Sequence, residues 1–214
     1  MAGLIHGLQQ KRCGNKVTIL EQEPGERHSH HAGIGFGTNA QEFLRKYDMT
    51  GLTPAFASHS RRWAYYTRPN VINTKGSIQL TSWGLLYSIL RANFDGLTSV
   101  ACPVPPPAAE NDGSAVYLAG KRVTALQYTK DIVIVNYIDA HTGRQDSIDA
   151  DMVIGADGVN STVRQLVNAP VTKKYAGYVA LRATIPEKLV SKETVDYFSD
   201  HLSLQFSKRT YLVW

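Results

Sequence analysis

The segment Met152-Val-Ile-Gly-Ala-Asp-Gly-Val-Asn-Ser-Thr-Val-Arg164 is the most informative about the fold, because an apolar run in it stops at glycines and gives way to a helix-like sequence. Val153 and Ile154 are typical of a buried strand, and the glycines permit a tight reversal of the backbone. Asp157 is then expected at the carboxyl end of that strand, where ligands bind in open α/β sheets. The alternative is a plain strand-loop-helix connection in which Asp157 or Ser161 caps the helix.

Composition is that of a soluble globular protein with one large domain or slightly more. Of the 214 residues, 43% are hydrophobic and 19% charged, and no apolar run is long enough for a transmembrane helix. The N-terminal sequence MAGLIHGLQQ does not resemble a secretory signal, and Cys13 and Cys102 have neither metal-binding nor redox spacing. We therefore expect a cytoplasmic protein with two reduced thiols and no membrane association.

Charge and histidine content do not indicate a nucleic-acid or metal site. The formal net charge is +5, but the basic residues are scattered and form no aromatic-basic motif of an RNA-binding module. His28, His30 and His31 lack cysteine or carboxylate partners at metal-binding spacing, so a solvated loop is predicted there. The sequence leaves the oligomeric state open.

Periodicity predicts alternating helices and strands. Helices are expected over 2–12, 39–47 and 81–94, a buried strand over 16–21, a three-strand meander over 121–128, 131–138 and 147–154, and further strands over 175–185 and 202–214. Residues 28–37 are predicted to form a flexible loop, and the proline-rich stretch 103–114 an exposed one. Ser82 is available to cap the third helix. The aromatic residues Trp63, Tyr65 and Tyr66 either line a substrate cavity or pack at the edge of a sheet.

The first helix and the strand after it carry an indication of nucleotide binding. Glu21 follows Gly3 by 18 residues, close to the roughly 20 residues that separate a glycine-rich turn from a ribose-binding acid. In that arrangement the helix N-terminus faces a pyrophosphate and the acid accepts hydrogen bonds from the ribose. The preceding strand and two earlier glycines of the full motif are absent from the sequence, so the pair alone is a weak signal.

Four segments, taken in order, resemble the class A flavoprotein monooxygenases, which are FAD-dependent aromatic hydroxylases. They are AGLIHGLQQKRCGNKVTILEQEP, HAGIGFGTNAQEFLRKYD, TSWGLLYSILRANFDGL and DADMVIGADGVNSTVRQ. The chain looks most similar to the salicylate and dihydroxypyridine hydroxylase branch. The resemblance implies an α/β fold with a Rossmann-like FAD/NAD(P)-binding domain over residues 1–170, lacking its first strand and followed by part of an antiparallel substrate-binding sheet over 171–214. It also implies truncation at both ends, because the family's opening Gly-x-Gly strand and its later Gly-Asp segment are absent.

The resemblance implies FAD as cofactor and NAD(P)H as reductant. It assigns Gly3 to the last glycine of the dinucleotide fingerprint, Glu21 to ribose binding and Val123 to a backbone contact with adenine. Asp157, with Gly158 beside it, is implied to contact the ribityl or pyrophosphate part of FAD.

The resemblance also bears on the reaction. Many family members have an arginine that binds the FAD phosphates near the position of Ser82. Ser82 can donate one hydrogen bond but brings no charge, and Arg91 lies too far along the helix for that role. The implied activity is hydroxylation of an aromatic or other electron-rich small molecule, in which reduced flavin captures oxygen as a hydroperoxide. No side chain is expected to act as a nucleophile. The alternative is a non-catalytic remnant of the fold that binds a small molecule or another protein.

Overall fold

The computed structural model describes residues 1–25, 33–53, 56–65, 68–168, 172–181, 185–198, 201–206 and 210–213. The chain divides into two compact units. The first comprises Met1–His30, Tyr47–Thr50 and Tyr87–Tyr178, and the second comprises His31–Lys46, Gly51–Leu86 and Val179–Trp214. Residues 31–46 and 51–86 are thus grouped with the C-terminal segment, whereas the division predicted at residue 170 places them in the first domain. That division into functional domains stays a prediction.

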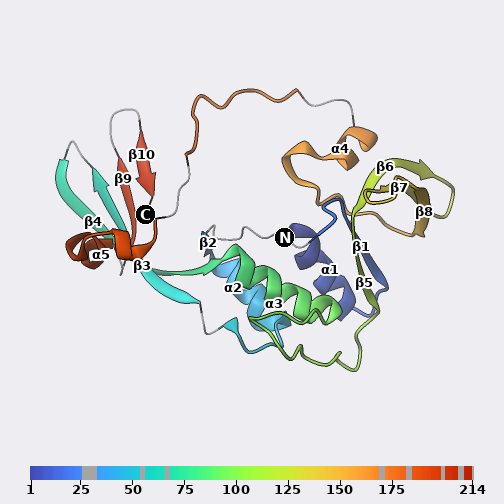
Figure 1. Ribbon diagram of the computed structural model, residues 1–214, viewed down its shortest axis with the longest axis horizontal. Helices are drawn as coiled ribbons and strands as arrows, with labels where there is room; N and C mark the ends of the chain where they lie inside the picture. Colours follow the sequence, from blue (N-terminus) through green and yellow to red (C-terminus); the bar gives the residue numbers. More distant parts are fainter. Residues whose placement is uncertain are drawn as a thin grey trace. The chain divides into compact units, whose positions relative to one another are not determined.

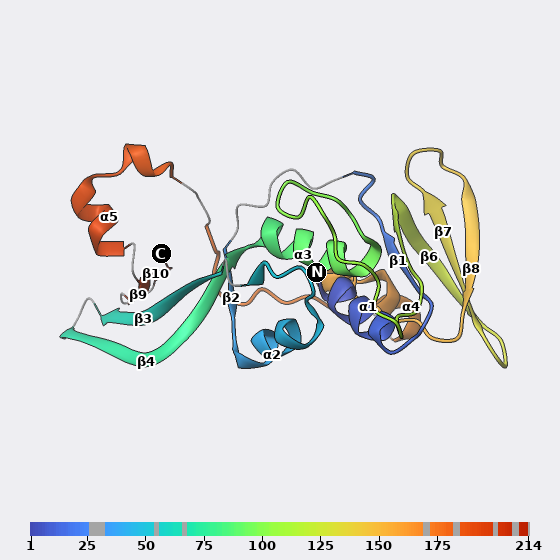
Figure 2. The same cartoon turned by 90° about the horizontal axis from the view of Figure 1, so that it is seen from below.

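The first unit combines a parallel strand pair, helices and a meander (Figure 1). Its elements are α1 (Ala2–Arg12), β1 (Val17–Glu21), β5 (Ala115–Ala119), β6 (Lys121–Tyr128), β7 (Val133–Asp139), β8 (Gln145–Ala150), η2 (Gly158–Asn160) and α4 (Thr162–Val167), and α3 (Trp83–Asp95) continues into it from the second unit. β1 and β5 pair in parallel, and β6, β7 and β8 form an antiparallel sheet. Figure 2 shows the three meander strands side by side.

Helix α1 packs closely on β1 because glycine occupies position 7. A Cβ at Gly7 would lie 3.0 Å from both Ile19 Cδ1 and Phe94 Cε2. The helix ends where Gly14 adopts a φ of +84°, a conformation that favours glycine after a helix. The buried apolar side chains of α1 and of the part of α3 in this unit include Leu4, Leu8, Ile89, Leu90 and Phe94.

The second unit contains a five-stranded sheet with the order β10-β9-β3-β4-β2. Its elements are β2 (Gly33–Phe36), α2 (Thr38–Tyr47), β3 (Ala57–Tyr65), β4 (Arg68–Ser82), η3 (Glu187–Leu189), α5 (Lys192–Phe198), β9 (His201–Phe206) and β10 (Tyr211–Val213). β3 pairs in parallel with β9, and the other neighbours are antiparallel. Phe36 and Phe56 are buried, with ring centroids 5.4 Å apart.

The predicted elements of the first 140 residues are largely confirmed. The structure contains the three helices, the strand before Glu21, the first two meander strands and an irregular segment over 103–114. The predicted loop over 28–37 is partly wrong, because residues 33–36 form β2. β3, which carries Trp63 and Tyr65, lies inside its sheet, so the alternative that places them at a sheet edge is wrong, and the alternative of a substrate cavity stays a prediction. The three histidines and Tyr66 lie outside the described residues.

The later strands differ more from the prediction. β8 ends at Ala150, and the side chains of Met152 and Ile154 are 63% and 44% exposed, so residues 151–154 are not a buried strand. The described part of 175–185 has no strand, and the single strand predicted over 202–214 is the hairpin β9–β10. Among the described residues, no helix has the length and apolar character needed to cross a bilayer.

Candidate functional site

The glycine-rich segment after β8 forms a tight connection into a short helix. Gly158 has a φ of +75°, which favours glycine, and it opens η2. A Cβ at Gly155 would come within 2.8 Å of Val163 Cγ1, so the helix lies directly on this backbone. Ser161 is buried and caps α4, because its Oγ accepts a hydrogen bond from the backbone N–H of Arg164 at 2.9 Å. The connection is therefore present, although the strand that precedes it, β8, ends at Ala150 rather than at Ile154.

Asp157 is exposed, and its carboxylate is held by hydrogen bonds within the connection. Oδ1 accepts one from Ser161 Oγ, and Oδ2 accepts one from the backbone N–H of Val163 at 3.0 Å. Partial burial favours the neutral acid, but these hydrogen bonds outweigh it and hold the pKa of Asp157 below its ordinary value. The capping alternative is thus realised by Asp157 and Ser161 together. The backbone N–H groups of Asp157 and Thr162 also favour the charged form of this carboxylate.

The first turn of α1 lies against this connection. A Cβ at Gly3 would be 3.5 Å from Ala156 Cβ. The helix begins after Met1 without a side-chain cap, and its first turn has no acidic residue. Its leading N–H groups and its dipole therefore place partial positive charge beside Ala156, which is the chemistry that binds a phosphate.

Glu21 and Val123 lie on strands of the same unit. Glu21 is the last residue of β1, and its Oε1 accepts a hydrogen bond from the backbone N–H of Glu23 at 3.1 Å. The Gly120 N–H donates to the Glu23 carbonyl at 2.9 Å, which ties the chain after β1 to the meander. Val123 lies opposite Tyr137 on β7, next to a shift in strand register.

Ser82 has a structural role at the junction of β4 and α3. Its Oγ accepts a hydrogen bond from the backbone N–H of Leu85 at 3.1 Å, which confirms the predicted cap. Ser82 belongs to the second unit, whereas the other predicted cofactor-binding residues belong to the first.

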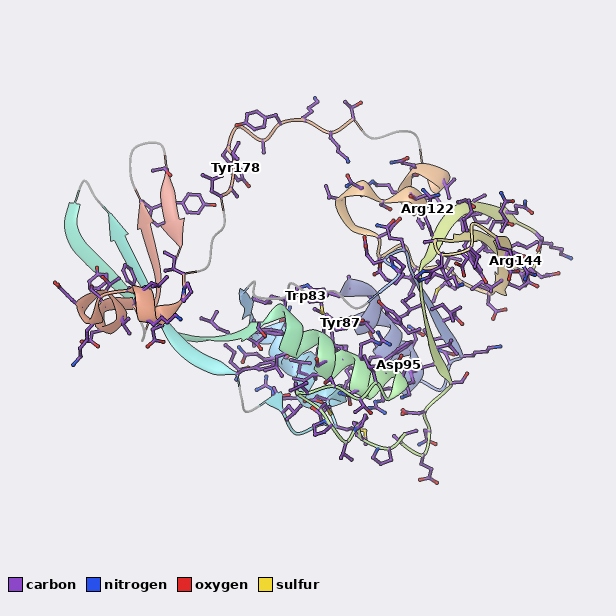
Figure 3. All side chains as sticks on the ribbon, viewed as in Figure 1. Trp83, Tyr87, Asp95, Arg122, Arg144 and Tyr178 are labelled. Atoms are coloured by element: carbon purple, nitrogen blue, oxygen red, sulfur yellow. The ribbon has the colours of Figure 1, made fainter. Side chains whose placement is uncertain are left out.

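No sequence pattern indicates a cluster between α3 and β5, in which Arg91 is buried and Tyr87, Asp95 and Tyr117 are half-buried. The Arg91 guanidinium donates to the Asp95 carboxylate from Nε at 2.9 Å and Nη2 at 2.8 Å, and to the Tyr87 hydroxyl from Nη1 at 2.6 Å. Its Cζ lies 3.7 Å from the centroid of the Tyr117 ring. Burial, a hydrogen bond with Tyr87 and the charge of Glu21 raise the pKa of Tyr117, so its phenol stays neutral. Figure 3 labels Tyr87 and Asp95 on α3.

Comparison with known proteins identifies one family over almost the whole chain. The family model that matches, described as FAD binding domain, covers residues 2–202. The chain is 29% identical over 178 residues to 6-hydroxynicotinate 3-monooxygenase of Pseudomonas fluorescens, covering 81% of this chain and 42% of that protein. It is 28% identical over 187 residues to kynurenine 3-monooxygenase of Salinispora arenicola, covering 82% and 38%. The chain therefore spans less than half the length of these curated relatives.

Solved structures include similar folds. That of 2,6-dihydroxypyridine-3-hydroxylase from Arthrobacter nicotinovorans superposes with a TM-score of 0.72 at 20% sequence identity, covering 99% of this chain and 47% of that chain. This likeness confirms the predicted α/β fold.

Proposed function

Because the chain belongs to the FAD binding domain family, we propose that it is part of an FAD-dependent, NAD(P)H-using monooxygenase that hydroxylates an aromatic or other electron-rich small molecule. The family match, together with the curated relatives, confirms the resemblance to class A flavoprotein monooxygenases. Both curated relatives named above are monooxygenases of small aromatic compounds, which supports the proposed substrate class.

The observation that carries the proposal is the approach of the α1 N-terminus to the Asp157 connection. A Cβ added at Gly3 would lie 3.5 Å from Ala156 Cβ, so only the space of one side-chain carbon separates the two residues, and the leading turn of α1 carries neither an acid nor a side-chain cap. These polar groups therefore fit a dinucleotide, since the α1 amides can donate hydrogen bonds to a pyrophosphate and the carboxylates of Asp157 and Glu21 can accept them from sugar hydroxyls.

Different residues of the first unit are proposed to bind different parts of the cofactor. The first-turn amides of α1, at Gly3, hold the pyrophosphate, Glu21 accepts hydrogen bonds from the ribose, and the Val123 backbone contacts adenine. When bound, FAD supplies the redox chemistry that activates oxygen, and the protein supplies orientation and exclusion of water. No side chain of the chain is proposed as a nucleophile.

Asp157 is proposed to accept a hydrogen bond from the ribityl chain, with the Gly158 backbone beside it. The lowered pKa of Asp157 keeps this carboxylate ionised at neutral pH, so it remains a charged acceptor. In the second unit, Ser82 is proposed to donate a hydrogen bond to the cofactor from its hydroxyl, which is compatible with its capping role because capping uses only an oxygen lone pair.

FAD binding by the purified 214-residue chain tests the proposal. The visible spectrum and quenching of flavin fluorescence during titration are expected to reveal uptake of FAD. Asp157→Asn is expected to weaken binding about tenfold or more, because a charge-assisted hydrogen bond is lost. Asp149→Asn, at an exposed acid on β8, makes the same charge change and is expected to leave binding unaltered.

A second control separates ligand contact from capping. Ser161→Ala removes the hydroxyl that caps α4 but leaves the carboxylate of Asp157, so it is expected to weaken FAD binding much less than Asp157→Asn. A colourless chain that takes up no added FAD would overturn the proposed function. Equal losses for Asp157→Asn and Asp149→Asn would remove Asp157 from the site.

A further inference from the structure

The Arg91 cluster joins α3 to the strand pair that ends at Glu21. Tyr117 lies beside Ile19 in the register of β1 and β5, and two residues further on Ala119 lies beside Glu21. Neighbouring residues of paired strands face the same side of the sheet, and so do residues two apart along one strand. Tyr117 and Glu21 therefore share the face on which Arg91 stacks, and the charge of Glu21 acts on the Tyr117 phenol.

The strand pair depends on such packing for its rigidity. Two strands alone are marginally stable in water, so their ends stay ordered only where other elements hold them. The middle of β1 is held where Ile19 lies against Gly7 of α1, a glycine that Phe94 of α3 also approaches. Toward the carboxyl end, the Arg91 guanidinium on the Tyr117 ring provides the next contact from α3.

Arg91 is itself held rigidly. Asp95 binds it through two parallel hydrogen bonds, Tyr87 through a third, and the Arg91 residue is only 9% exposed. A guanidinium fixed in this way presents a flat cation to an aromatic face, a geometry that a lysine ammonium does not reproduce. The charges of Arg91 and Asp95 also balance locally, so the cluster needs no further counter-ion.

We propose that Arg91 is a positioning residue for Glu21: through its stack on Tyr117 it fixes the end of the β1–β5 pair, so that the Glu21 carboxylate is preorganised to bind the ribose of the adenosine half of the cofactor. This inference rests on the proposed function. Preorganisation of this kind raises affinity because the acid loses little conformational freedom on binding.

A double-mutant cycle on the full chain tests the inference. Arg91→Lys keeps the charge but loses the planar stack and the two-pronged pairing with Asp95. Arg91→Lys, Glu21→Gln and the double variant are compared with the wild type by titration calorimetry. The ligands are FAD, ADP and FMN, of which FMN lacks adenosine. Arg91→Lys is expected to weaken FAD and ADP binding about tenfold when Glu21 is present and about twofold or less in the Glu21→Gln background. FMN binding is expected to stay unchanged.

The outcomes separate this inference from the proposed function. If the wild-type chain binds neither FAD nor ADP, both are overturned. If it binds them and Arg91→Lys has the same effect with and without Glu21→Gln, Arg91 is merely structural and only the inference is overturned. If Arg91→Lys does not fold, Asp95→Asn, which keeps the guanidinium but removes its charged anchor, is carried through the same cycle with the same criteria.

Discussion

Replacing Asp112 with alanine is expected to destabilise the first unit by about 3 kcal/mol. The Asp112 side chain is 1% exposed and pairs with Arg12, and its Oδ2 lies 3.6 Å from Lys11 Nζ. The same oxygen accepts the backbone N–H of Ala109 at 3.0 Å. One carboxylate therefore neutralises two buried cations at the C-terminal end of α1 and fixes the proline-rich segment to the helix. Loss of the Asp112 carboxylate therefore affects α1, whose N-terminal end lies at the proposed cofactor site.

The expected destabilisation depends on the hydrogen bonds that Lys11 and Arg12 retain after Asp112 is removed. Removing one partner of a buried ion pair costs about 3–5 kcal/mol, because the remaining charge stays buried without compensation. Here Arg12 keeps the Asn93 Oδ1 at 3.2 Å and Lys11 keeps the Asn93 carbonyl at 2.7 Å, which places the cost at the low end. Burial already lowers the pKa of Lys11, so release of its proton can also relieve the unpaired charge. Against a typical total of about 5–15 kcal/mol, this loss is large.

Urea unfolding followed by circular dichroism measures this prediction, together with hydrogen exchange of the α1 amides. Asp149→Ala removes an exposed acid of β8 and serves as the matched control. Asp112→Asn keeps the shape and an acceptor oxygen but not the charge, and its cost is expected to lie between the two. If Asp112→Ala changes the unfolding free energy by no more than about 0.5 kcal/mol relative to Asp149→Ala, the reasoning about the buried pair is refuted.

Three further predictions concern packing, pH and capping. Gly7→Ala gains about 1 kcal/mol of helix propensity, but crowding of Ile19 and Phe94 is expected to cost more. Thermal unfolding should therefore show a net loss of about 1 kcal/mol in the free energy of unfolding. A net gain would show that the contact relaxes freely. Because the folded pKa of Asp157 lies below the unfolded value, its ionised form stabilises the fold at neutral pH and this contribution is lost as pH falls below about 4 through the folded pKa. Urea midpoints of Asp157→Asn should therefore fall less on acidification than those of the wild type, and parallel curves would contradict this. Ser161→Ala should cost about 1 kcal/mol and speed hydrogen exchange in α4 but not in α1, whereas unchanged α4 exchange would argue against the cap.

Local sequence patterns were sufficient to predict elements that depend on residues close together in the chain. Leu4 and Leu8 recur at helical spacing and both are buried, and Gly14 after the helix has the positive φ that is common at such an end. Ser82 was recognised as a cap because its side chain and the amide that it binds are only three residues apart.

Pairings between distant segments were not accessible in this way. β5 is a five-residue strand between the proline-rich segment and Gly120, and its partner is β1, which lies far earlier in the chain. No local period encodes a parallel pairing of that kind. Tyr117 lies on this strand, so its contact with Arg91 was missed for the same reason. Residues 151–154 show the opposite error, since an apolar pattern predicted a strand that the described residues do not form.

The site prediction at Asp157 illustrates why a structural role and a ligand-binding role need not exclude each other. The hydrogen bonds from Ser161 and Val163 restrict the carboxylate to one orientation and keep it ionised. An unrestrained aspartate would lose side-chain freedom on accepting a ligand hydroxyl, whereas this one has already lost it during folding. Capping therefore reduces the entropic cost of accepting a hydrogen bond from a ligand. Because Gly3 lies close to Ala156, this carboxylate is near the N-terminal end of α1, which has no side-chain cap. One short connection therefore brings an acceptor for sugar hydroxyls close to amide donors for a phosphate.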